Sequence, residues 1–340
     1  MFSRLVTGLV LFFTCVLAVA FSWHVFTVWQ ARENPRTAAM YRDQEGGVAD
    51  ALSRLSLLPF GKRQRNLMSV IIENHESARP YHQGLEKALV IQEYPVEGFI
   101  TRFLATFEKE NLPPLLGPVR SLRPYFVDTI RPWNTPLLFA GGSPEAFERA
   151  AALETLFAVN GLGHPDEFMR DSTIPAPHNL FVDDAGALKL LKPSTPKRIE
   201  WPPYETGPVQ SHSGALTIAI DYLNPSHNTR YTYDHFSMSY VRDNGGIISQ
   251  AQPRNVLLLE IGIASIGEYG RLDIPLLGRG RAMLFRDGTI ERGTWSRATL
   301  DAWFTFQNEE GNAFVFAKGQ TWMTVVPSFD RLTWSQERNL

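Results

Sequence analysis

The sequence predicts an α+β protein, in which an N-terminal transmembrane helix precedes an N-terminal mixed α/β domain and then a mostly antiparallel β domain. Three observations predict this fold class. An uncharged segment opens the chain, helix-like and strand-like segments then alternate up to residue 191, and strand-like runs separated by turns fill the rest. With 340 residues, the chain is long enough for two ordinary domains and a leader.

The leader contains 25 consecutive uncharged residues, Leu5–Trp29. About 20 apolar residues cross a bilayer as a helix. A cleavable signal peptide is the alternative, because Ala18–Ala20 resembles a small-residue cleavage site. The apolar run continues beyond that site, so we expect an uncleaved, single-pass anchor in the cytoplasmic membrane, with the bulk of the chain extracytoplasmic.

The composition is that of a globular protein, with 44% hydrophobic and 20% charged residues. The net charge of −2 argues against a nucleic-acid partner, because proteins that bind nucleic acids usually carry a basic face. The one cysteine, Cys15, lies in the leader. Disulfides, cysteine-ligated zinc and a cysteine nucleophile are therefore excluded for the rest of the chain.

Changes in composition divide the chain into five expected segments. They are the anchor at 1–30, a juxtamembrane stalk at 31–65, the mixed α/β domain at 66–191, a linker at 192–214 and the β-rich domain at 215–335. The linker contains five prolines and shows no apolar periodicity. Turn signals such as DNGG separate the strand-like runs of the last segment.

The mixed domain begins with apolar runs rich in β-forming residues, which predict three strands at 67–75, 87–96 and 98–109. A helix is expected next, with Ser121 as its N-cap. A strand, a Gly-Gly turn and a second helix follow, with Ser143 as N-cap and Pro144 at the first helical position. Another short helix closes the domain.

The usual sequence signatures of catalysis are missing. The chain has no Walker loop, no Gly-x-Gly-x-x-Gly, no His-Glu-x-x-His and no Gly-x-Ser-x-Gly. The spacing of His75 and His82 fits no standard pair of metal ligands. We therefore expect no metal and no cofactor.

The segment GPVRSLRPYFVD places Arg120 and Arg123 near the start of the predicted helix. Positive charge there opposes the helix dipole by about 0.3–1 kcal/mol per residue, so a negative group should compensate. Two alternatives are open. The arginines form an internal network with Glu73, Glu93 and Glu97, or they hold an external carboxylate, phosphate or polyol.

Two neighbouring features favour a pocket. The glycine pair 141–142 allows backbone N–H groups to approach a ligand closely. The loop RDSTIPAPHN gathers polar groups at a strand end, where α/β folds bind ligands. These polar groups belong to Arg170, Asp171, His178 and Asn179.

Several motifs resemble the YerB-like family, which comprises exported bacterial lipoproteins of unknown function. They are IENHESARP, QEYPVEGFITRFLATF, GPVRSLRPYFVD, FAGGSPEA and RDSTIPAPHNLF, with YTYD, GTW and GQTWMTVVP later in the chain. The resemblance covers roughly residues 65–330. It implies two adjacent domains, mixed and then β-rich, held outside the cytoplasmic membrane, and it implies no established activity.

Carried over position by position, the resemblance implies a set of candidate ligand-binding residues. They are Glu73, Asn74, Arg79, Glu93, Glu97, Arg102, Arg120, Arg123, Asp128, Ser143, Arg170, Asp171, His178 and Asn179. This chain departs from the family in two places. It lacks the lipidation cysteine, and it reads IISQAQ where relatives carry a His-x-Asp after the YVRDNGG turn.

Two functional hypotheses remain from the sequence. The first is a binding or scaffolding module for an anionic cell-envelope component, such as a cell-wall polymer, or for an envelope protein. The alternative is a cell-envelope hydrolase or transferase that uses a glutamate as general acid or base, His178 as proton carrier and arginines to stabilise negative charge. Trp295 and Trp322 are either core residues or platforms for stacking sugar rings.

Overall fold

The computed structural model describes residues 63–192, 198–208, 214–222, 224–267 and 270–336. The expected anchor and nearly all of the expected stalk lie outside these residues. No helix in the described ranges is both long and apolar enough to span a membrane.

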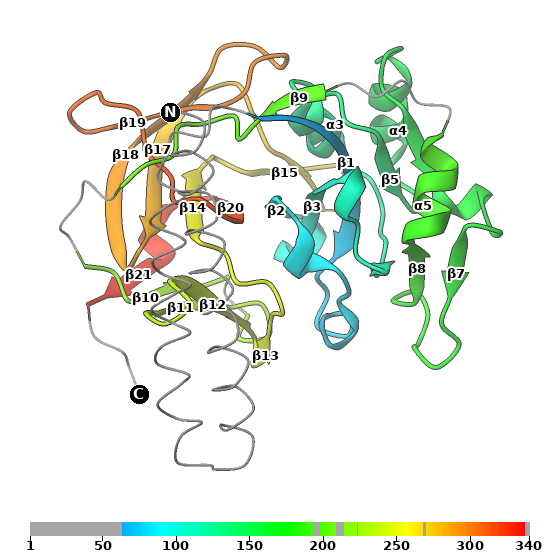
Figure 1. Cartoon of the computed structure of the whole chain (residues 1–340), viewed down its shortest axis with the longest axis horizontal. Helices are drawn as coiled ribbons and strands as arrows, with labels where there is room; N and C mark the ends of the chain where they lie inside the picture. Colours follow the sequence, from blue (N-terminus) through cyan, green and yellow to red (C-terminus); the bar gives the residue numbers. More distant parts are fainter. Residues whose placement is uncertain (1–62, 193–197, 209–213, 223, 268–269, 337–340) are drawn as a thin grey trace, which may run out of the picture. The chain divides into compact units, whose positions relative to one another are not determined.

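Eleven strands form the main sheet, and they come from both halves of the chain (Figure 1). Ten are neighbours in the order β19-β18-β17-β14-β20-β2-β3-β1-β5-β6, and β9 pairs with the first residues of β1. Their bounds in that order are Thr305–Asn308, Thr289–Arg297, Gly278–Arg286, Asn255–Glu260, Thr321–Val326, Val90–Pro95, Thr101–Glu108, Arg63–Glu73, Leu137–Phe139 and Ala158–Asn160, with β9 at Arg198–Trp201. Strand β9 lies in the proline-rich segment that was expected to be a linker.

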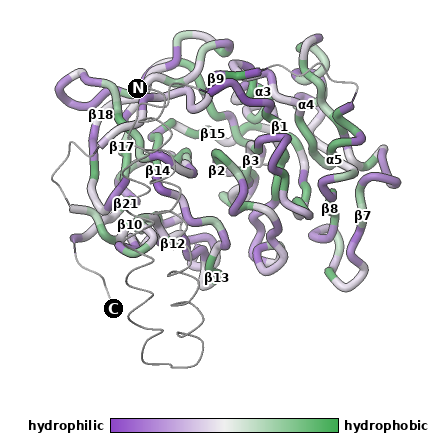
Figure 2. Tube along the Cα trace, in the orientation of Figure 1, coloured by the Kyte–Doolittle hydropathy of each residue, from purple (hydrophilic) through white to green (hydrophobic). Residues whose placement is uncertain are grey.

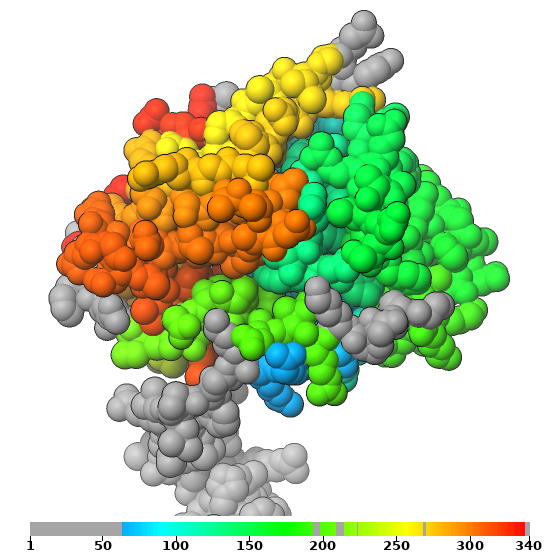
Figure 3. Space-filling model, turned by 90° about the horizontal axis from the view of Figure 1, so that it is seen from above, coloured from blue at the N-terminus to red at the C-terminus, as the bar shows by residue number. Residues whose placement is uncertain are grey.

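Strand β20 joins the two halves of the chain. It lies between β2 and β14 and runs parallel to both. Thr321 is in register with Val90 on one side and with Asn255 on the other. The two halves therefore share one sheet, and Figure 3 shows the later half, in yellow to red, packed directly against the green part of the earlier half.

Smaller sheets and short helices complete the described fold. The five-stranded sheet has the order β13-β12-β11-β10-β21, with bounds Ile247–Ile248, Ser239–Asn244, Thr229–Asp234, Thr217–Ile220 and Leu332–Ser335. The other two sheets are β4-β8-β7 (Leu115–Leu116, Leu180–Asp183, Phe168–Arg170) and β15-β16 (Ala264–Ile266, Arg271–Asp273). The α-helices in the described ranges are α3 (Pro124–Ile130), α4 (Pro144–Ala151) and α5 (Asp184–Leu191). The 3₁₀ helices η1 to η6 are Arg79–Tyr81, Leu85–Lys87, Glu97–Phe99, Lys109–Asn111, Gly161–Gly163 and Phe329–Arg331.

Both faces of the main sheet are covered, which explains why its central strands are apolar almost throughout. Every residue of β2 is buried, and side chains of one strand alternate between the two faces. Phe103 and Trp322 belong to one core, whereas Leu104 and Met323 belong to the other, so both halves contribute to each core. Figure 2 shows hydrophobic residues in central strands such as β3, whereas β18, near the edge of the sheet, is largely hydrophilic. A charged residue in these strands must find its partner inside the protein.

Helix α3 begins later than predicted. Its N-cap is Arg123, with φ −130° and ψ 157°, and Pro124 takes the first helical position. The prediction that Ser121 is the N-cap is wrong, because the residue before a proline is disfavoured in the helical region and proline itself favours the first helical position. Arg123 therefore lies at the boundary of the helix.

Helix α4 begins as predicted. The hydroxyl oxygen of Ser143 accepts a hydrogen bond from the backbone N–H of Ala146 at 3.3 Å, and Pro144 follows at the first helical position. The candidate residue Ser143 therefore stabilises the start of α4 as its N-cap.

We expect Ser143→Ala to lower the free energy of unfolding by about 1 kcal/mol, because one helix N–H loses its acceptor. Urea unfolding of the full-length chain in detergent micelles, followed by circular dichroism, measures this change. Ser143→Asp keeps a capping oxygen and should retain most of the stability. An alanine variant as stable as the aspartate variant would contradict the capping role.

Candidate functional site

The first group of predicted residues meets at the carboxyl ends of parallel strands β1 and β5. The segment before α3 lies between these ends, since the N–H of Arg120 donates to the carbonyl of Ile71 and the N–H of Ala140 donates to the carbonyl of Arg120, both at 2.9 Å. Glu73, the last residue of β1, is buried at this point. The topology therefore brings a strand end and an arginine-bearing segment together, as predicted.

Glu73 has two cationic or polar partners. Its Oε1 lies 3.0 Å from Nε of Arg120, and its Oε2 lies 2.9 Å from Nδ1 of His178. The ring of His75 stacks on the ring of His178, with centroids 5.0 Å apart. The loop that carries His178 thus folds back onto β1.

The second arginine of the segment also has an internal partner. Arg123 donates to both carboxylate oxygens of Glu97, at 2.7 and 2.8 Å. Burial alone would raise the pKa of Glu97, but the hydrogen bonds and charge of Arg123 outweigh it and lower that pKa. Arg102 donates to the carbonyl of Ser121 at 2.7 Å, and burial together with the charge of Arg123 lowers its pKa to about 10. For Arg120 and Arg123, the geometry favours the internal network.

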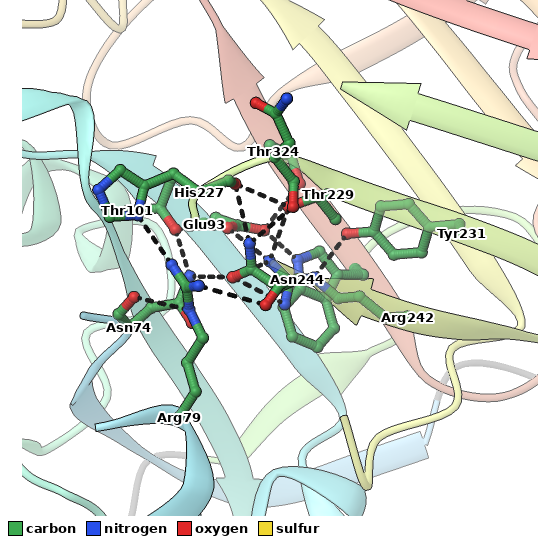
Figure 4. Close-up of polar contacts among 12 residues, drawn as sticks. Asn74, Arg79, Glu93, Thr101, His227, Thr229, Tyr231, Arg242, Asn244 and Thr324 are labelled. Carbon is green, nitrogen blue, oxygen red and sulfur yellow. Dashed lines mark hydrogen bonds and ion pairs between the residues drawn. The ribbon is translucent and has the colours of Figure 1, made fainter. Parts of the chain in front are cut away.

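The second group of residues surrounds Glu93, which lies in β2 and is 1% exposed. Its Oε1 accepts hydrogen bonds from Thr101 at 2.6 Å and from Arg242 at 2.8 Å. Its Oε2 accepts from the indole N–H of Trp322 at 2.7 Å and from Thr324 at 3.3 Å. The carboxylate is therefore held by donors from both halves of the chain (Figure 4).

Arg242, in β12, is the ionic partner of Glu93 and is 2% exposed. Its guanidinium lies over the ring of Trp322, 4.4 Å from the centroid, and its Nε donates to the hydroxyl of Tyr231 at 3.2 Å. Burial opposes the charged form of Arg242, but the charge of Glu93 outweighs it and raises the pKa of Arg242. The pair is almost fully desolvated, and the hydrogen bonds from Thr101, Trp322 and Thr324 to the carboxylate help to offset that cost.

Arg79, in η1, is 4% exposed but has only uncharged partners. Its Nη1 donates to the backbone carbonyls of Ser226 and Asn244, and its Nε donates to Asn74 at 3.2 Å. Its Nη2 lies 3.0 Å from Nδ1 of His227, which must accept because a guanidinium only donates. Among the described residues, no carboxylate forms an ion pair with Arg79. Burial and the charge of Arg242 lower its pKa to about 10.

A cavity of about 90 Å³ opens beside these arginines, and we call it the cationic pocket. Its inner end is formed by four buried residues, Asn74, Arg79, Arg242 and Asn244, and its outer rim by exposed residues of and after β13, including Ile247, Ile248 and Gln250. No acidic residue lines it. Two guanidiniums line it. Glu93 pairs with that of Arg242, whereas Glu93 and the exposed Glu76 act on Arg79 without forming an ion pair with it.

The remaining candidate residues do not join either group. Asp128, in α3, pairs with Arg149, although burial raises its pKa. Arg170 donates to the side-chain oxygen of Asn179 at 2.8 Å, within the β7–β8 hairpin. The exposed Asp171 accepts hydrogen bonds from Thr173, which lower its pKa. Asp128 thus links α3 to α4, whereas the other side chains stabilise their own hairpin or turn.

Arg242 and Asn244 were missed by the sequence reasoning. The sequence carries a signal for them, because Tyr240, Arg242 and Asn244 occupy alternate positions of a strand-like run and therefore share one face. The structure places all three in the interior. A charged residue on the tyrosine-bearing face of a strand predicts a buried guanidinium. Nothing in the sequence near Arg242 indicates that its partner is Glu93, which lies on a strand of the other half of the chain.

Trp295 and Trp322 are core residues, with 2% and 0% of their surface exposed. Their indole N–H groups are used internally, by the carbonyl of Glu260 and the carboxylate of Glu93. The alternative that they stack on sugar rings is wrong, because neither ring face reaches the surface.

We expect Glu93→Ala to lower the free energy of unfolding by about 3–5 kcal/mol, because it leaves the guanidinium of Arg242 buried and unpaired. Glu97→Ala breaks a pair whose side chains are 29% and 16% exposed, so it should cost only about 1 kcal/mol. Urea unfolding of both variants measures the difference. Equal stabilities would show that the buried pair contributes no more than the surface pair.

We expect stability to fall as the pH drops from about 6.5 to about 4. The ring of His82 donates to the carbonyl of Glu73 at 2.6 Å, and burial lowers its pKa to about 4. In this window the unfolded state binds a proton that the folded state does not, which costs up to about 3 kcal/mol. Urea unfolding at several pH values should show a smaller loss in His82→Gln than in wild type. His235→Gln, at an exposed ring, is the control and should keep the wild-type slope.

Comparison with known proteins gives consistent matches in sequence and in structure. The protein named "Putative lipoprotein YerB" of Bacillus subtilis (strain 168) is 27% identical over 311 residues, which cover 84% of this chain and 91% of that protein. The crystal structure of YerB protein from Bacillus subtilis matches with a TM-score of 0.72 and 28% identity, and the match covers 80% of this chain and 94% of that one. The resemblance to YerB-like proteins is therefore confirmed.

Two family models match successive parts of the chain. Residues 59–196 match the N-terminal domain of the family described as "Protein of unknown function (DUF3048)", and residues 218–323 match its C-terminal domain. The group around Glu73 and the group around Glu93 both contain residues of the first matched region. The cationic pocket is lined by residues of both regions. Because the two models together span most of its length, this chain belongs to the DUF3048 family.

Proposed function

We propose that this protein is an extracytoplasmic binding module, anchored at the cytoplasmic membrane, that holds an anionic group of a cell-envelope component or of a protein partner. The anionic group enters the cationic pocket and contacts the guanidiniums of Arg79 and Arg242. The proposed location and the proposed binding are supported by separate observations.

The observation that carries the proposal is the environment of Arg79. Its guanidinium is almost fully buried, has no carboxylate partner among the described residues and lines a pocket without acidic residues. The charges of Glu93 and Glu76 offset that of Arg79 only in part, since neither forms an ion pair with it. A buried charge without a paired counter-ion is costly, by several kcal/mol in general. One N–H of Nη2 remains for a ligand, because the other faces His227. A bound anion would supply the missing negative charge.

The proposed location rests on the leader and on the relative. The uncharged run Leu5–Trp29 has the length of a membrane-spanning helix, and the Bacillus subtilis relative bears the name "Putative lipoprotein YerB". Cys15 lies in the middle of the apolar run. We therefore propose that a helix, in place of a lipid, holds this chain at the membrane.

The alternative of an envelope hydrolase or transferase would use the contact of 2.9 Å between Glu73 and His178, but that carboxylate is also paired with Arg120. Glu73, Glu93 and Glu97 are each ion-paired with an arginine. A general acid or base needs a carboxyl group whose protonation is poised near the working pH. Arg123 lowers the pKa of Glu97, and Glu73 and Glu93 each face a guanidinium, which suits a structural network around a binding pocket.

We expect sodium acetate and inorganic phosphate, at constant ionic strength, to raise the melting temperature of the full-length chain in detergent micelles. Gln250→Glu places a carboxylate at the rim of the pocket and should weaken acetate binding by about tenfold, because it supplies negative charge in place of the ligand. Isothermal titration calorimetry measures the affinities.

The matched control is Gln252→Glu, the same change two positions along the chain. Gln252 does not line the pocket and its side-chain oxygen already accepts from Ser239 at 3.5 Å, so this variant should bind acetate as wild type does. Failure of both anions to bind the wild type, or equal affinities in the two variants, would contradict an anion site in this pocket.

A further inference from the structure

Strand β13 is a free edge of the five-stranded sheet and carries exposed apolar side chains. Its one neighbour among the described strands is β12. Ile247 is 38% exposed and Ile248 is 59% exposed, and both line the mouth of the cationic pocket. An exposed apolar edge strand is a template for pairing with another chain. The free edge and the pocket are therefore parts of one surface.

In the register of the β12–β13 hairpin, the backbone N–H and C=O of Ile248 do not form hydrogen bonds with β12. The two strands are joined by Gly245 and Gly246, both with positive φ (62° and 88°), as a two-residue hairpin loop requires. The N–H of Ser249 donates to the carbonyl of Arg242 at 2.8 Å. Because hydrogen-bonded and non-hydrogen-bonded pairs alternate in an antiparallel ladder, the N–H and C=O of Ile248 point away from β12, toward the free edge.

The pocket opens on the face of the hairpin that carries the buried arginine. Residues directly opposite each other in a ladder share a face. Ile247 is in register with Asn244, so its side chain shares the face of Asn244 and Arg242. A chain that adds to the free edge of β13 would thus place alternate groups toward the cationic pocket.

The size and charge of the pocket select the ligand group. A cavity of about 150 Å³ holds benzene, so the volume of about 90 Å³ has room for a group of about four heavy atoms, such as a carboxylate with its attached carbon. Arg242 is paired with Glu93, so among the described residues of the lining Arg79 is the guanidinium without an ion-pair partner, and its single charge matches a monoanion. A phosphate monoester carries about −1.5 to −2 near neutral pH and would leave excess negative charge.

We infer that the ligand is the C-terminal end of an extended peptide from another chain. The terminal carboxylate enters the cationic pocket beside Arg79 and Arg242, the preceding residue pairs with the backbone of Ile248, and an apolar side chain of the peptide contacts Ile247. Edge-strand addition and capture of a terminal carboxylate are both recurring modes of peptide recognition. This inference rests on the anion-binding function proposed above and names the ligand class.

The test uses a randomised N-acetylated tripeptide library in two forms, with a free C-terminal acid and with a C-terminal amide. Equilibrium dialysis against the full-length protein in detergent micelles, followed by mass spectrometry, measures the retained peptides. We expect at least tenfold greater retention of the acid form than of the amide form. The retained acids should be enriched in apolar residues.

Two variants of Ile248 test the role of the edge. Ile248→Pro removes the outward N–H without removing a ladder hydrogen bond to β12, and should lower retention of the acid library at least tenfold. Ile248→Val keeps the N–H and an apolar branched side chain, and should retain the library as wild type does.

The outcomes separate this inference from the proposed function. Acetate binding to the wild type, with equal retention of acid and amide libraries or with full retention by Ile248→Pro, would overturn the peptide inference and leave the anion site standing. Tight binding of inorganic phosphate without retention of either library would assign the pocket to phosphate groups and overturn the inference as well. Absence of acetate, phosphate and peptide binding would overturn both proposals.

Discussion

The buried ion pair between Glu93 and Arg242 is the interaction on which the rest of the structure depends. It joins β2, from the first half of the chain, to β12, from the second half, and both side chains are almost completely removed from solvent. Two buried charges are tolerated only when the geometry is good and the remaining lone pairs are satisfied. Thr101, Trp322 and Thr324 meet that condition around the carboxylate. The shared main sheet and this ion pair therefore hold the same two halves together, one through backbone hydrogen bonds and the other through charge.

The same network carries an excess of positive charge. Arg79 enters it through carbonyl oxygens and His227, without adding a carboxylate. Carbonyl dipoles stabilise a guanidinium less than an ionised partner does, which agrees with the lowered pKa of Arg79. The buried network that holds the two halves together thus also lines the cationic pocket. The proposed binding function therefore uses residues that also stabilise the fold.

The arginines before α3 show the opposite balance. Arg120 and Arg123 each face a carboxylate, and their side chains are 27% and 16% exposed. Partly exposed ion pairs contribute little, typically about 0–1 kcal/mol, because water and salt screen them. These pairs align the segment between β1 and β5, whereas the buried pair at Glu93 sets the arrangement of the halves. The charge pattern that is most conspicuous in the sequence is therefore not the one with the largest energetic role.

The sequence by itself determined the local structure and the family. Apolar runs predicted β1, β2 and β3, and the Ser-Pro pair predicted the start of α4, because these features depend on residues close together in the chain. The start of α3 was misplaced although the rule for residues before proline was available locally. Six of the candidate residues, Glu73, Glu97, Arg102, Arg120, Arg123 and His178, meet at the end of β1.

Only the tertiary structure decided that β20 lies between β2 and β14, and that Glu93 pairs with Arg242. Strand order and cross-strand partners depend on which distant segments bury the most apolar surface together, and no local period in the sequence encodes that choice.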